Sequence, residues 1–234
     1  MTEKEFMDSL LGIYQVVKVL SHKNGSRVYL MRNNTVGGSM VVRFYEKPVA
    51  AYNKLIRISH PNLPEIYDVY ELDDVQVVFE EYVDGITVEE VLEGGRYTYS
   101  GVKKVIRHVG YALEVLHGMN IIHRDIKPGN IIISKDGAVK LIDLNASREY
   151  VPERKTDTVV LGTVGYASPE QYGISQSGTG ADIYALGVLL NVMLTGKHPS
   201  EKLAGGKAGR IVLKCTQIDP ERRFGSVEKL IHAL

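Results

Sequence analysis

The sequence has little cysteine, no long apolar run and no excess of either charge. Among its 234 residues the single cysteine, Cys215, excludes an internal disulfide framework and a zinc site built from thiolates. No apolar run reaches the roughly 18 residues of a membrane-spanning helix. Residues 1–8 are charged and lack the apolar centre of a signal peptide. We therefore expect a cytoplasmic protein with no membrane span in this chain.

The charges balance, with 28 Lys and Arg against 28 Asp and Glu. This balance removes the electrostatic argument for binding nucleic acid or an acidic membrane, so we expect no nucleic-acid partner. The hydrophobic share of 44% and the charged share of 24% are typical of globular proteins. The length suits one or two domains with a sizeable core.

The first third of the chain is rich in strand-forming residues. The expected strands are residues 14–22, 26–32, 39–45, 68–72 and 75–82. Asn24-Gly25 predicts a tight hairpin between the first two, because both turn positions need positive φ. Pro48 can begin a short helix that reaches about residue 59. The sequence thus predicts a small antiparallel sheet with one short helix.

After residue 85 the apolar pattern changes to that of helices. Thr87 and Glu90 form a capping box, and apolar residues then recur in steps of three and four from Ser100 until Gly118. Residues 181–194 are apolar nearly all round, which predicts a buried helix, and residues 226–234 predict a last amphipathic helix. The fold class is therefore α+β, with a strand-rich part followed by a helical part.

The residues with the strongest chemical signal lie in the stretch His-Arg-Asp-Ile-Lys-Pro-Gly-Asn at 123–130, followed by Asp143. Phosphoryl transfer needs a carboxylate that orients the attacking hydroxyl, oxygen ligands for Mg²⁺ and a cation near the transferred group. Asp125 supplies the first, Asn130 and Asp143 the second, and Lys127 the third.

These motifs resemble the protein kinase family, over nearly the whole chain, and are most similar to bacterial Ser/Thr kinases. Residues 162–170 resemble the end of an activation segment, 182–187 a buried aspartate motif, and 219–224 a late arginine motif. The resemblance implies one bilobal kinase domain, 1–234. Its parts would be an N-lobe at 1–82, a hinge at 83–86 and a C-lobe at 87–234, with the activation segment at 143–170.

The resemblance also implies a role for each matching residue. Asp125 would be the catalytic base, Lys127 would contact the γ-phosphate, and Asn130 and Asp143 would hold magnesium. Thr163 would shape the acceptor site, and Lys127 favours Ser or Thr over Tyr as acceptor. The residues expected to be structural are His123, Arg124, Glu170, Asp182 and Arg223, with Glu170 paired to Arg223. Phosphate on Thr156 or Thr158 would order the activation segment by pairing with Arg124.

The nucleotide-binding half departs from the family pattern. Ser21, Lys23 and Ser26 stand at the three glycines of the Gly-rich loop, and only Gly25 remains. Two interpretations stay open, a weakened phosphate loop and a tight hairpin with no phosphate role. The residues expected to contact ATP are Val28, Val41, Arg43, Glu80, Glu81, Val83 and Ile132.

Further departures concern charged side chains. Arg43 replaces the usual lysine, and Ala51 stands where the partner glutamate is expected. Glu80 occupies the gatekeeper position, and a buried carboxylate needs a cationic partner. We expect an Arg43–Glu80 pair; the alternative turns Glu80 out to solvent. Asn145 replaces the glycine of the magnesium motif and tolerates positive φ.

Three functions remain open on the sequence alone. The first is ATP- and Mg²⁺-dependent transfer of the γ-phosphate to Ser or Thr hydroxyls of a protein substrate. The second is a pseudokinase, a nucleotide-binding or scaffolding module without useful catalysis. The third is a small-molecule kinase of the aminoglycoside type, against which Lys127 and the segment from Thr163 to Glu170 argue. Bacterial kinases of this kind are often the front end of a longer protein, so anchoring to a membrane through such a protein is a further expectation.

Overall fold

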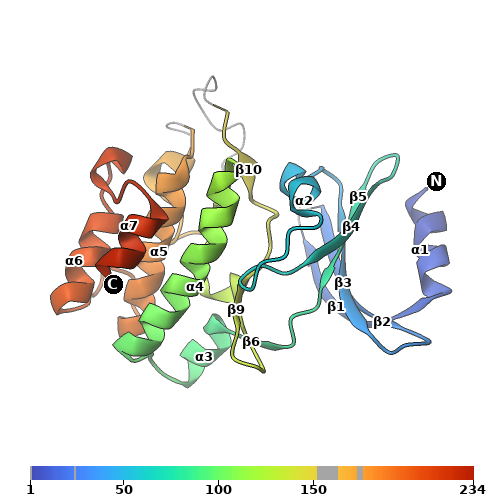
Figure 1. Ribbon diagram of the computed structural model, residues 1–234, viewed down its shortest axis with the longest axis horizontal. Helices are drawn as coiled ribbons and strands as arrows, with labels where there is room; N and C mark the ends of the chain where they lie inside the picture. Colours follow the sequence, from blue (N-terminus) through green and yellow to red (C-terminus); the bar gives the residue numbers. More distant parts are fainter. Residues whose placement is uncertain (1, 24, 152–162, 173–175) are drawn as a thin grey trace. The chain divides into compact units, whose positions relative to one another are not determined.

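The computed structural model describes residues 2–23, 25–151, 163–172 and 176–234. The chain folds into two compact units (Figure 1). Unit 1 comprises residues 1–60 and 64–83, and unit 2 comprises residues 61–63 and 84–234. The chain crosses between the units at residues 60/61, 63/64 and 83/84. The hinge at 83–86 stays a prediction. Thr156 and Thr158 lie outside the described residues.

Unit 1 is built on a five-stranded antiparallel sheet in the order β1-β2-β3-β5-β4. Its strands are β1 (Tyr14–Lys23), β2 (Ser26–Asn33), β3 (Ser39–Tyr45), β4 (Ile66–Glu71) and β5 (Gln76–Glu81). All five predicted strands are confirmed. Gly25, with φ of 71°, lies in the turn between β1 and β2, where the sequence predicts positive φ.

One face of this sheet packs against helix α1 (Glu3–Leu11). Alternate residues of β3, Met40, Val42 and Phe44, are buried there with Phe6 and Leu10 of the helix. Helix α1 was not predicted from the sequence, so the expectation of a single helix in this part was wrong. The signal was present, because Thr2 and Glu5 form a capping box whose two hydrogen bonds both exist.

The other face of the sheet carries Val41, Arg43 and Tyr45, and helix α2 (Ala50–Leu55) packs on it. The hydroxyls of Tyr45 and Tyr52 are 2.9 Å apart and their rings are stacked. The predicted helix at 48–59 therefore exists but is shorter at both ends. Pro48 lies before the helix instead of beginning it.

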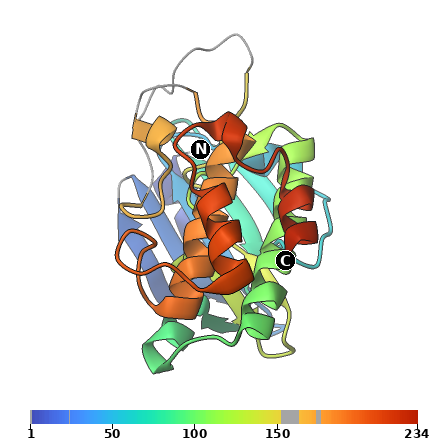
Figure 2. The ribbon, with the colours of Figure 1, turned by 90° about the vertical axis from the view of Figure 1, so that its left-hand side faces the viewer.

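Unit 2 is mainly helical (Figures 1 and 2). Its helices are α3 (Val88–Gly94), α4 (Tyr99–Gly118), α5 (Thr179–Thr195), α6 (Gly206–Cys215) and α7 (Val227–Ala233). Figure 2 shows α5 beside α6 and α4 beside α7, in agreement with the contacts between these helices. Strands β6 (Gly85–Thr87), β8 (Ile131–Ser134) and β9 (Val139–Leu141) form one small sheet, and β7 (Ile121–Ile122) pairs with β10 (Arg148–Glu149).

The helices of unit 2 largely follow the predicted pattern. Helix α4 ends at Gly118, and α5 is buried over most of its length. Helix α6 was not predicted, because the glycines at 205, 206 and 209 suggest a loop. Its apolar side chains nevertheless recur at helical spacing, at Ala208, Ile211, Val212 and Cys215, and all four are buried.

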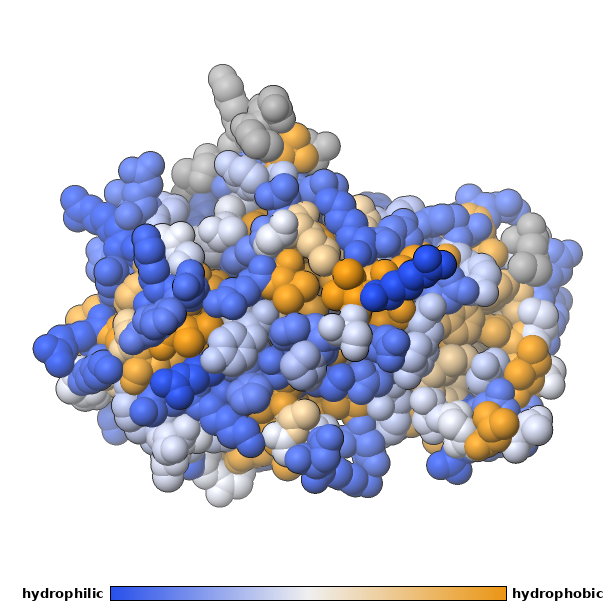
Figure 3. Space-filling view, in the orientation of Figure 1, coloured by the Kyte–Doolittle hydropathy of each residue, from blue (hydrophilic) through white to orange (hydrophobic). Residues whose placement is uncertain are grey.

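The surface seen in Figure 3 is mostly hydrophilic, with hydrophobic side chains exposed in smaller groups among charged ones. Among the described residues, no helix combines the length and the apolar character needed to cross a bilayer.

Candidate active site

The carboxylate of Asp125 is surrounded by three of the predicted site residues. Lys127 places its Nζ 2.6 Å from Asp125 Oδ2, and Thr163 donates its hydroxyl to Asp125 Oδ1 at 2.7 Å. Asn130 donates from Nδ2 to the same carboxylate at 2.9 Å and to the Asp125 carbonyl at 2.8 Å. Lys127 Nζ also contacts Thr163 Oγ1 at 2.9 Å. A turn of 3₁₀ helix at Pro128–Asn130 produces this arrangement by folding Asn130 back onto Asp125.

These contacts decide the charge state of Asp125. Burial raises the pKa of its carboxyl, but hydrogen bonds from Lys127, Thr163 and Asn130, together with the lysine charge, outweigh burial and leave the pKa below its ordinary value. Asp125 is therefore ionised at neutral pH, and its side chain keeps 14% of its surface exposed. An ionised, accessible carboxylate is able to accept a hydrogen bond from an incoming hydroxyl.

Asn130 and Asp143 are brought close by the backbone. The amide of Ile142 donates to the Asn130 carbonyl at 2.9 Å, so Asp143 follows directly on this contact. Because Asn130 Nδ2 is used on Asp125, its Oδ1 is the atom left for a metal. An amide oxygen and a carboxylate suit Mg²⁺, which takes its other ligands from phosphates and water. No group of three or more His, Cys, Asp or Glu side chains that could hold a metal exists within the described parts of the chain.

Positive φ in the magnesium motif falls on its first residue and not on Asn145, whose tolerance of positive φ is therefore not used. The residue with positive φ is Asp143, at 67°, and Asn145 is not among the described residues with positive φ. Asp143 Oδ1 accepts a hydrogen bond from the Asn145 amide at 3.2 Å, so an aspartate side chain stabilises this turn locally.

The catalytic loop, residues 123–130, is anchored by hydrogen bonds to the carboxylate of Asp182, as the resemblance implies. Its carboxylate accepts the backbone amides of His123 at 3.0 Å and Arg124 at 2.8 Å. The second amide belongs to a residue with φ of 68°, a conformation that needs such support. His117 Nε2 lies 2.8 Å from the same carboxylate, a contact that was not predicted from the sequence. Burial raises the pKa of Asp182, but the His117 contact and the other hydrogen bonds lower it below its ordinary value.

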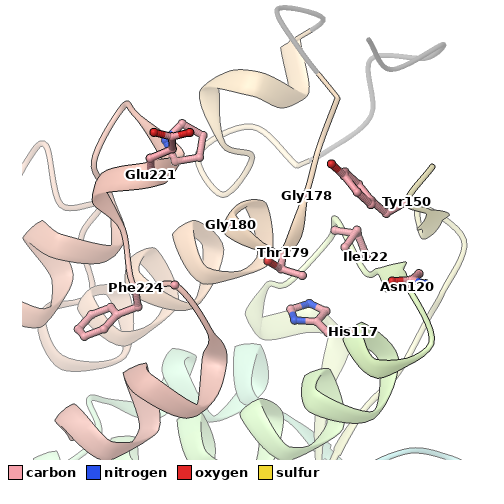
Figure 4. Close-up of a pocket in the computed structure, with 11 residues that line it drawn as sticks. His117, Asn120, Ile122, Tyr150, Gly178, Thr179, Gly180, Glu221 and Phe224 are labelled. Carbon is pink, nitrogen blue, oxygen red and sulfur yellow. The ribbon is translucent and has the colours of Figure 1, made fainter. Parts of the chain in front are cut away.

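A cavity of about 380 Å³ adjoins His117 (Figure 4). Thr179 at the start of α5, Ile122 and Phe224 also line it, and none of them was predicted as a site residue. Asp125, Asn130 and Asp143 are not among its lining residues, so the cavity is separate from the candidate reacting groups.

His123 is buried and has a structural environment, as expected. Its Nδ1 accepts the Asp125 amide at 3.3 Å, which leaves Nε2 to donate to the Ile142 carbonyl, also at 3.3 Å. Both ring nitrogens are thus used by the backbone of the site. Burial lowers the pKa of His123 below its ordinary value, so the ring is neutral.

The neutral state of His123 predicts a pH dependence of stability. Below about pH 6.5 the unfolded chain binds a proton at this position that the folded protein does not, so stability falls as pH decreases, by at most about 1.4 kcal/mol per pH unit. Urea unfolding at pH 7.5 and 5.5 should therefore show a larger loss for wild type than for His123→Asn. His22→Asn, at an exposed histidine, serves as control. An equal loss in wild type and His123→Asn contradicts this account.

Arg223 and Glu170 form the predicted ion pair. Two guanidinium nitrogens of Arg223 contact the two Glu170 oxygens at 2.6 and 2.9 Å. Gln171, next to Glu170, donates to the Arg124 carbonyl at 2.8 Å and accepts the Ser168 amide. The segment that ends in Glu170 is thereby attached to the catalytic loop. Gln171 was not predicted as a site residue.

In unit 1, the strand register places four predicted nucleotide-contacting residues on one face of the sheet. Val28 lies opposite Arg43, and Val41 lies opposite Glu80. Arg43 donates from Nε to Glu80 Oε1 at 2.7 Å, and its Nη2 is 2.7 Å from the same oxygen. Glu80 is 2% exposed, so the predicted pair forms and the alternative with Glu80 in solvent is excluded. Ala51 is buried in α2.

The remaining predicted nucleotide contacts are distributed over both units. Glu81 ends β5 and is half-buried, and Val83 is buried. Ile132 belongs to β8 in unit 2 and is half-buried. Their contact with a nucleotide stays a prediction.

The Arg43–Glu80 pair predicts a measurable coupling. Removing one partner leaves a buried charge uncompensated, whereas removing both does not. A double-mutant cycle with Arg43→Ala and Glu80→Ala should therefore give a coupling energy of about 1–3 kcal/mol in urea unfolding. If the Glu80→Ala variant keeps the stability and the nucleotide affinity of wild type, the pairing is contradicted.

A sheet-containing unit, a helical unit and a catalytic loop centred on a hydrogen-bonded aspartate together define a protein kinase. The family described as protein kinase domain matches residues 14–224. The chain therefore belongs to the protein kinase family.

Several curated relatives are named serine/threonine-protein kinases, and many of these are bacterial. The chain is 32% identical over 221 residues to the serine/threonine-protein kinase PrkC of Bacillus subtilis, covering 89% of this chain and 34% of that protein. It is 31% identical over 189 residues to the probable serine/threonine-protein kinase PknB of Lactococcus lactis, covering 80% of this chain and 29% of that protein. The chain thus spans about a third of the length of these relatives. The comparisons do not support the pseudokinase alternative.

Proposed function

We propose that this protein transfers the γ-phosphate of ATP to Ser and Thr hydroxyls of protein substrates. The observation that carries the proposal is the contact between Thr163 Oγ1 and Asp125 Oδ1 at 2.7 Å. The contact supports the proposal because the Thr163 hydroxyl, which has the chemistry of an acceptor side chain, donates to the ionised carboxylate. The bacterial Ser/Thr kinases to which the chain is similar support the same acceptor chemistry.

In the proposed reaction Asp125 orients the acceptor hydroxyl and takes up its proton as the phosphoryl group is transferred. Lys127, already beside Asp125, offsets negative charge on the transferred group. Asn130 Oδ1 and Asp143 would hold Mg²⁺. The ion neutralises charge on the nucleotide phosphates.

The nucleotide would contact one face of the sheet in unit 1. Val28 and Val41 offer apolar surface to the base, and Arg43 offers a charge that Glu80 holds in place. Glu81 and Val83 would offer backbone groups. The altered Gly-rich loop still has positive φ at Gly25, which allows a turn but supplies only one glycine for close approach to phosphate.

Activation by phosphate on Thr156 or Thr158 is part of the same proposal, with Arg124 as the partner of the phosphate. The structure does not describe either threonine. Arg124 itself is buried and has positive φ, next to Asp125. A phosphothreonine that pairs with this guanidinium would thus place its negative charge next to Asp125.

The test is transfer from ATP to a mixture of Ser- and Thr-containing peptides, with and without a chelator. Transfer should require Mg²⁺ and should be lost in Asp143→Asn, while the overall fold seen by circular dichroism is kept. Transfer that persists in the chelator would contradict the role given to Asn130 and Asp143. Absence of transfer under all conditions would contradict the proposed function itself.

A further inference from the structure

Unit 1 contains a cavity of about 540 Å³ that the proposed function does not use. It lies on the sheet face that packs against helix α1 (Figure 1). Its volume is typical of a small-molecule site. The aromatic side chains and the single charged side chain that line it are Tyr14, Tyr67, Tyr70, Phe79 and Asp68, and no Lys or Arg of the described chain lines it. The cavity is therefore aromatic and carries negative charge.

The pairing of β4 with β5 brings these side chains together. Asp68 lies opposite Phe79, and residues that are opposite in an antiparallel pair point to the same face. Phe79 packs in the cluster beneath α1, so Asp68 and Tyr70, two positions further along β4, are on that face as well. A bulge between Ile66 and Asp68 adds Tyr67 as an unpaired residue, and its side chain also lines the cavity.

The aromatic side chains are packed but still accessible. The Tyr70 ring contacts the rings of Phe6 and Phe79, with ring centroids 5.6 Å apart in both pairs. Tyr67 and Tyr70 nevertheless keep 50% and 43% of their surface exposed. The face of an aromatic ring attracts cations, and sites lined by several aromatic rings are typical for quaternary ammonium groups. The exposed rings thus favour a cationic ligand.

The carboxylate of Asp68 supplies the opposite charge. Its Oδ1 accepts the next backbone amide at 2.9 Å, and within the described parts of the chain it forms no ion pair. A hydrogen bond to Asp68 is the main cause that raises the pKa of Tyr70. Burial first, and then the charges of Glu81 and Glu65, raise the pKa of Tyr67. The negative potential therefore reaches both exposed tyrosines of the cavity.

We propose that this cavity binds a small organic cation that carries a quaternary ammonium group. The positive charge would lie against Asp68, and the methyl groups would contact the rings of Tyr67 and Tyr70. A primary ammonium fits less well, because it has three donors and the aromatic wall offers them few acceptors. The cavity and Arg43 are on opposite faces of the sheet, so this proposal stands independently of the proposed function.

The experiment follows backbone amide chemical shifts of the protein during titration with choline. The titration extends to about 50 mM, since a ligand of this size is expected to bind with a Kd of roughly 1–10 mM. The neutral analogue 3,3-dimethylbutan-1-ol has the shape of choline without its charge, and ethanolamine has the charge without the methyl groups. Sodium chloride at the same concentrations controls for ionic strength.

Two variants remove the two components of the site separately. Asp68→Asn removes the charge, and Tyr67→Leu removes an exposed ring but keeps an apolar side chain. Each should weaken choline binding by about three- to ten-fold. The matched controls are Asp74→Asn, at an exposed aspartate between β4 and β5, and Tyr111→Leu, at an exposed tyrosine of α4. Both controls should bind choline within about two-fold of wild type.

In wild type, choline should shift the amides of residues 33–39 and 67–70 in a saturable way, and both analogues should bind more weakly. Equal shifts with sodium chloride or with the neutral analogue would overturn the proposal. So would unchanged choline binding in folded Asp68→Asn and Tyr67→Leu.

A second arm uses vesicles of phosphatidylcholine, because a lipid headgroup and a free compound carry the same ammonium group. Sedimentation of wild type with the vesicles, reduced in Asp68→Asn and Tyr67→Leu, would assign the site to a headgroup. Binding of choline without sedimentation would assign it to a free compound. Failure of both choline and the vesicles to bind overturns the proposal.

Discussion

Replacing Asp125 by Asn is expected to lower kcat by about 10²- to 10⁴-fold, with little change in KM. Asparagine has nearly the same shape as aspartate and can still accept a hydrogen bond from Asn130 or Lys127. It cannot take up the proton of the acceptor hydroxyl, and it carries no negative charge to orient that hydroxyl. The loss should therefore appear in the chemical step and not in substrate binding.

The matching control is Asp136→Asn, which removes an exposed aspartate from the turn between β8 and β9. Its kcat should remain within about two-fold of wild type, because the substitution lies on the surface and outside the reacting groups. Circular dichroism and urea unfolding establish that the Asp125→Asn variant is folded. A folded Asp125→Asn protein with wild-type kcat would exclude Asp125 as the catalytic base.

Replacing Arg223 by Met is expected to destabilise unit 2 by about 3–5 kcal/mol. The Arg223 side chain is fully buried and contacts Glu170 twice, at 2.6 and 2.9 Å. It also donates to the carbonyls of Gly180, Gln217 and Ile218. Methionine fills much of the volume, but it leaves a buried carboxylate and three carbonyls without their donor.

The double variant Arg223→Met with Glu170→Met separates the contribution of the ion pair from that of the hydrogen bonds between Arg223 and the backbone carbonyls. Removing the carboxylate as well should restore part of the lost stability, because no uncompensated charge remains buried. Urea unfolding of wild type, both single variants and the double variant gives the four free energies. Equal stability of Arg223→Met and wild type, or strictly additive losses, would contradict a coupled pair.

Much of the candidate site was predictable because its residues are close in sequence. Asp125, Lys127 and Asn130 lie within six positions of one another, so a short turn is sufficient to bring them together. The sheet of unit 1 was predictable because its strands are rich in strand-forming residues such as Val and Tyr, and because Gly25 and Asp73-Asp74 mark two of its turns. The Arg43–Glu80 pair followed from a physical requirement, namely that a buried carboxylate needs a cation.

The features that were missed depend on tertiary packing or on weak local signals. Helix α6 begins among glycines, and its amphipathic face is stabilised by burial against α5 instead of by intrinsic propensity. His117 reaches Asp182 across 65 positions of sequence. The positive φ at Asp143 was not predicted, because residue preference favours asparagine or glycine in this conformation, whereas the turn after β9 fixes the backbone of Asp143.

The departures in unit 1 do not remove the charged pair expected near the nucleotide. In the family pattern a lysine on β3 pairs with a glutamate of the following helix, and here Ala51 of α2 cannot serve. Glu80 of β5 supplies the carboxylate instead, from the strand next to Arg43. The positive charge of Arg43 is therefore still fixed on this face of the sheet. This favours an active kinase over a pseudokinase.

The most direct test of Asp125-dependent phosphotransfer is the mass of peptide products after incubation with ATP and Mg²⁺. Three peptides that differ only in a Ser, Thr or Tyr acceptor are each incubated with wild type and with Asp125→Asn. The account predicts a phosphate added by wild type to the Ser and Thr peptides, and none above background by the variant. Equal transfer by both proteins, or no transfer by wild type to any peptide, would contradict it.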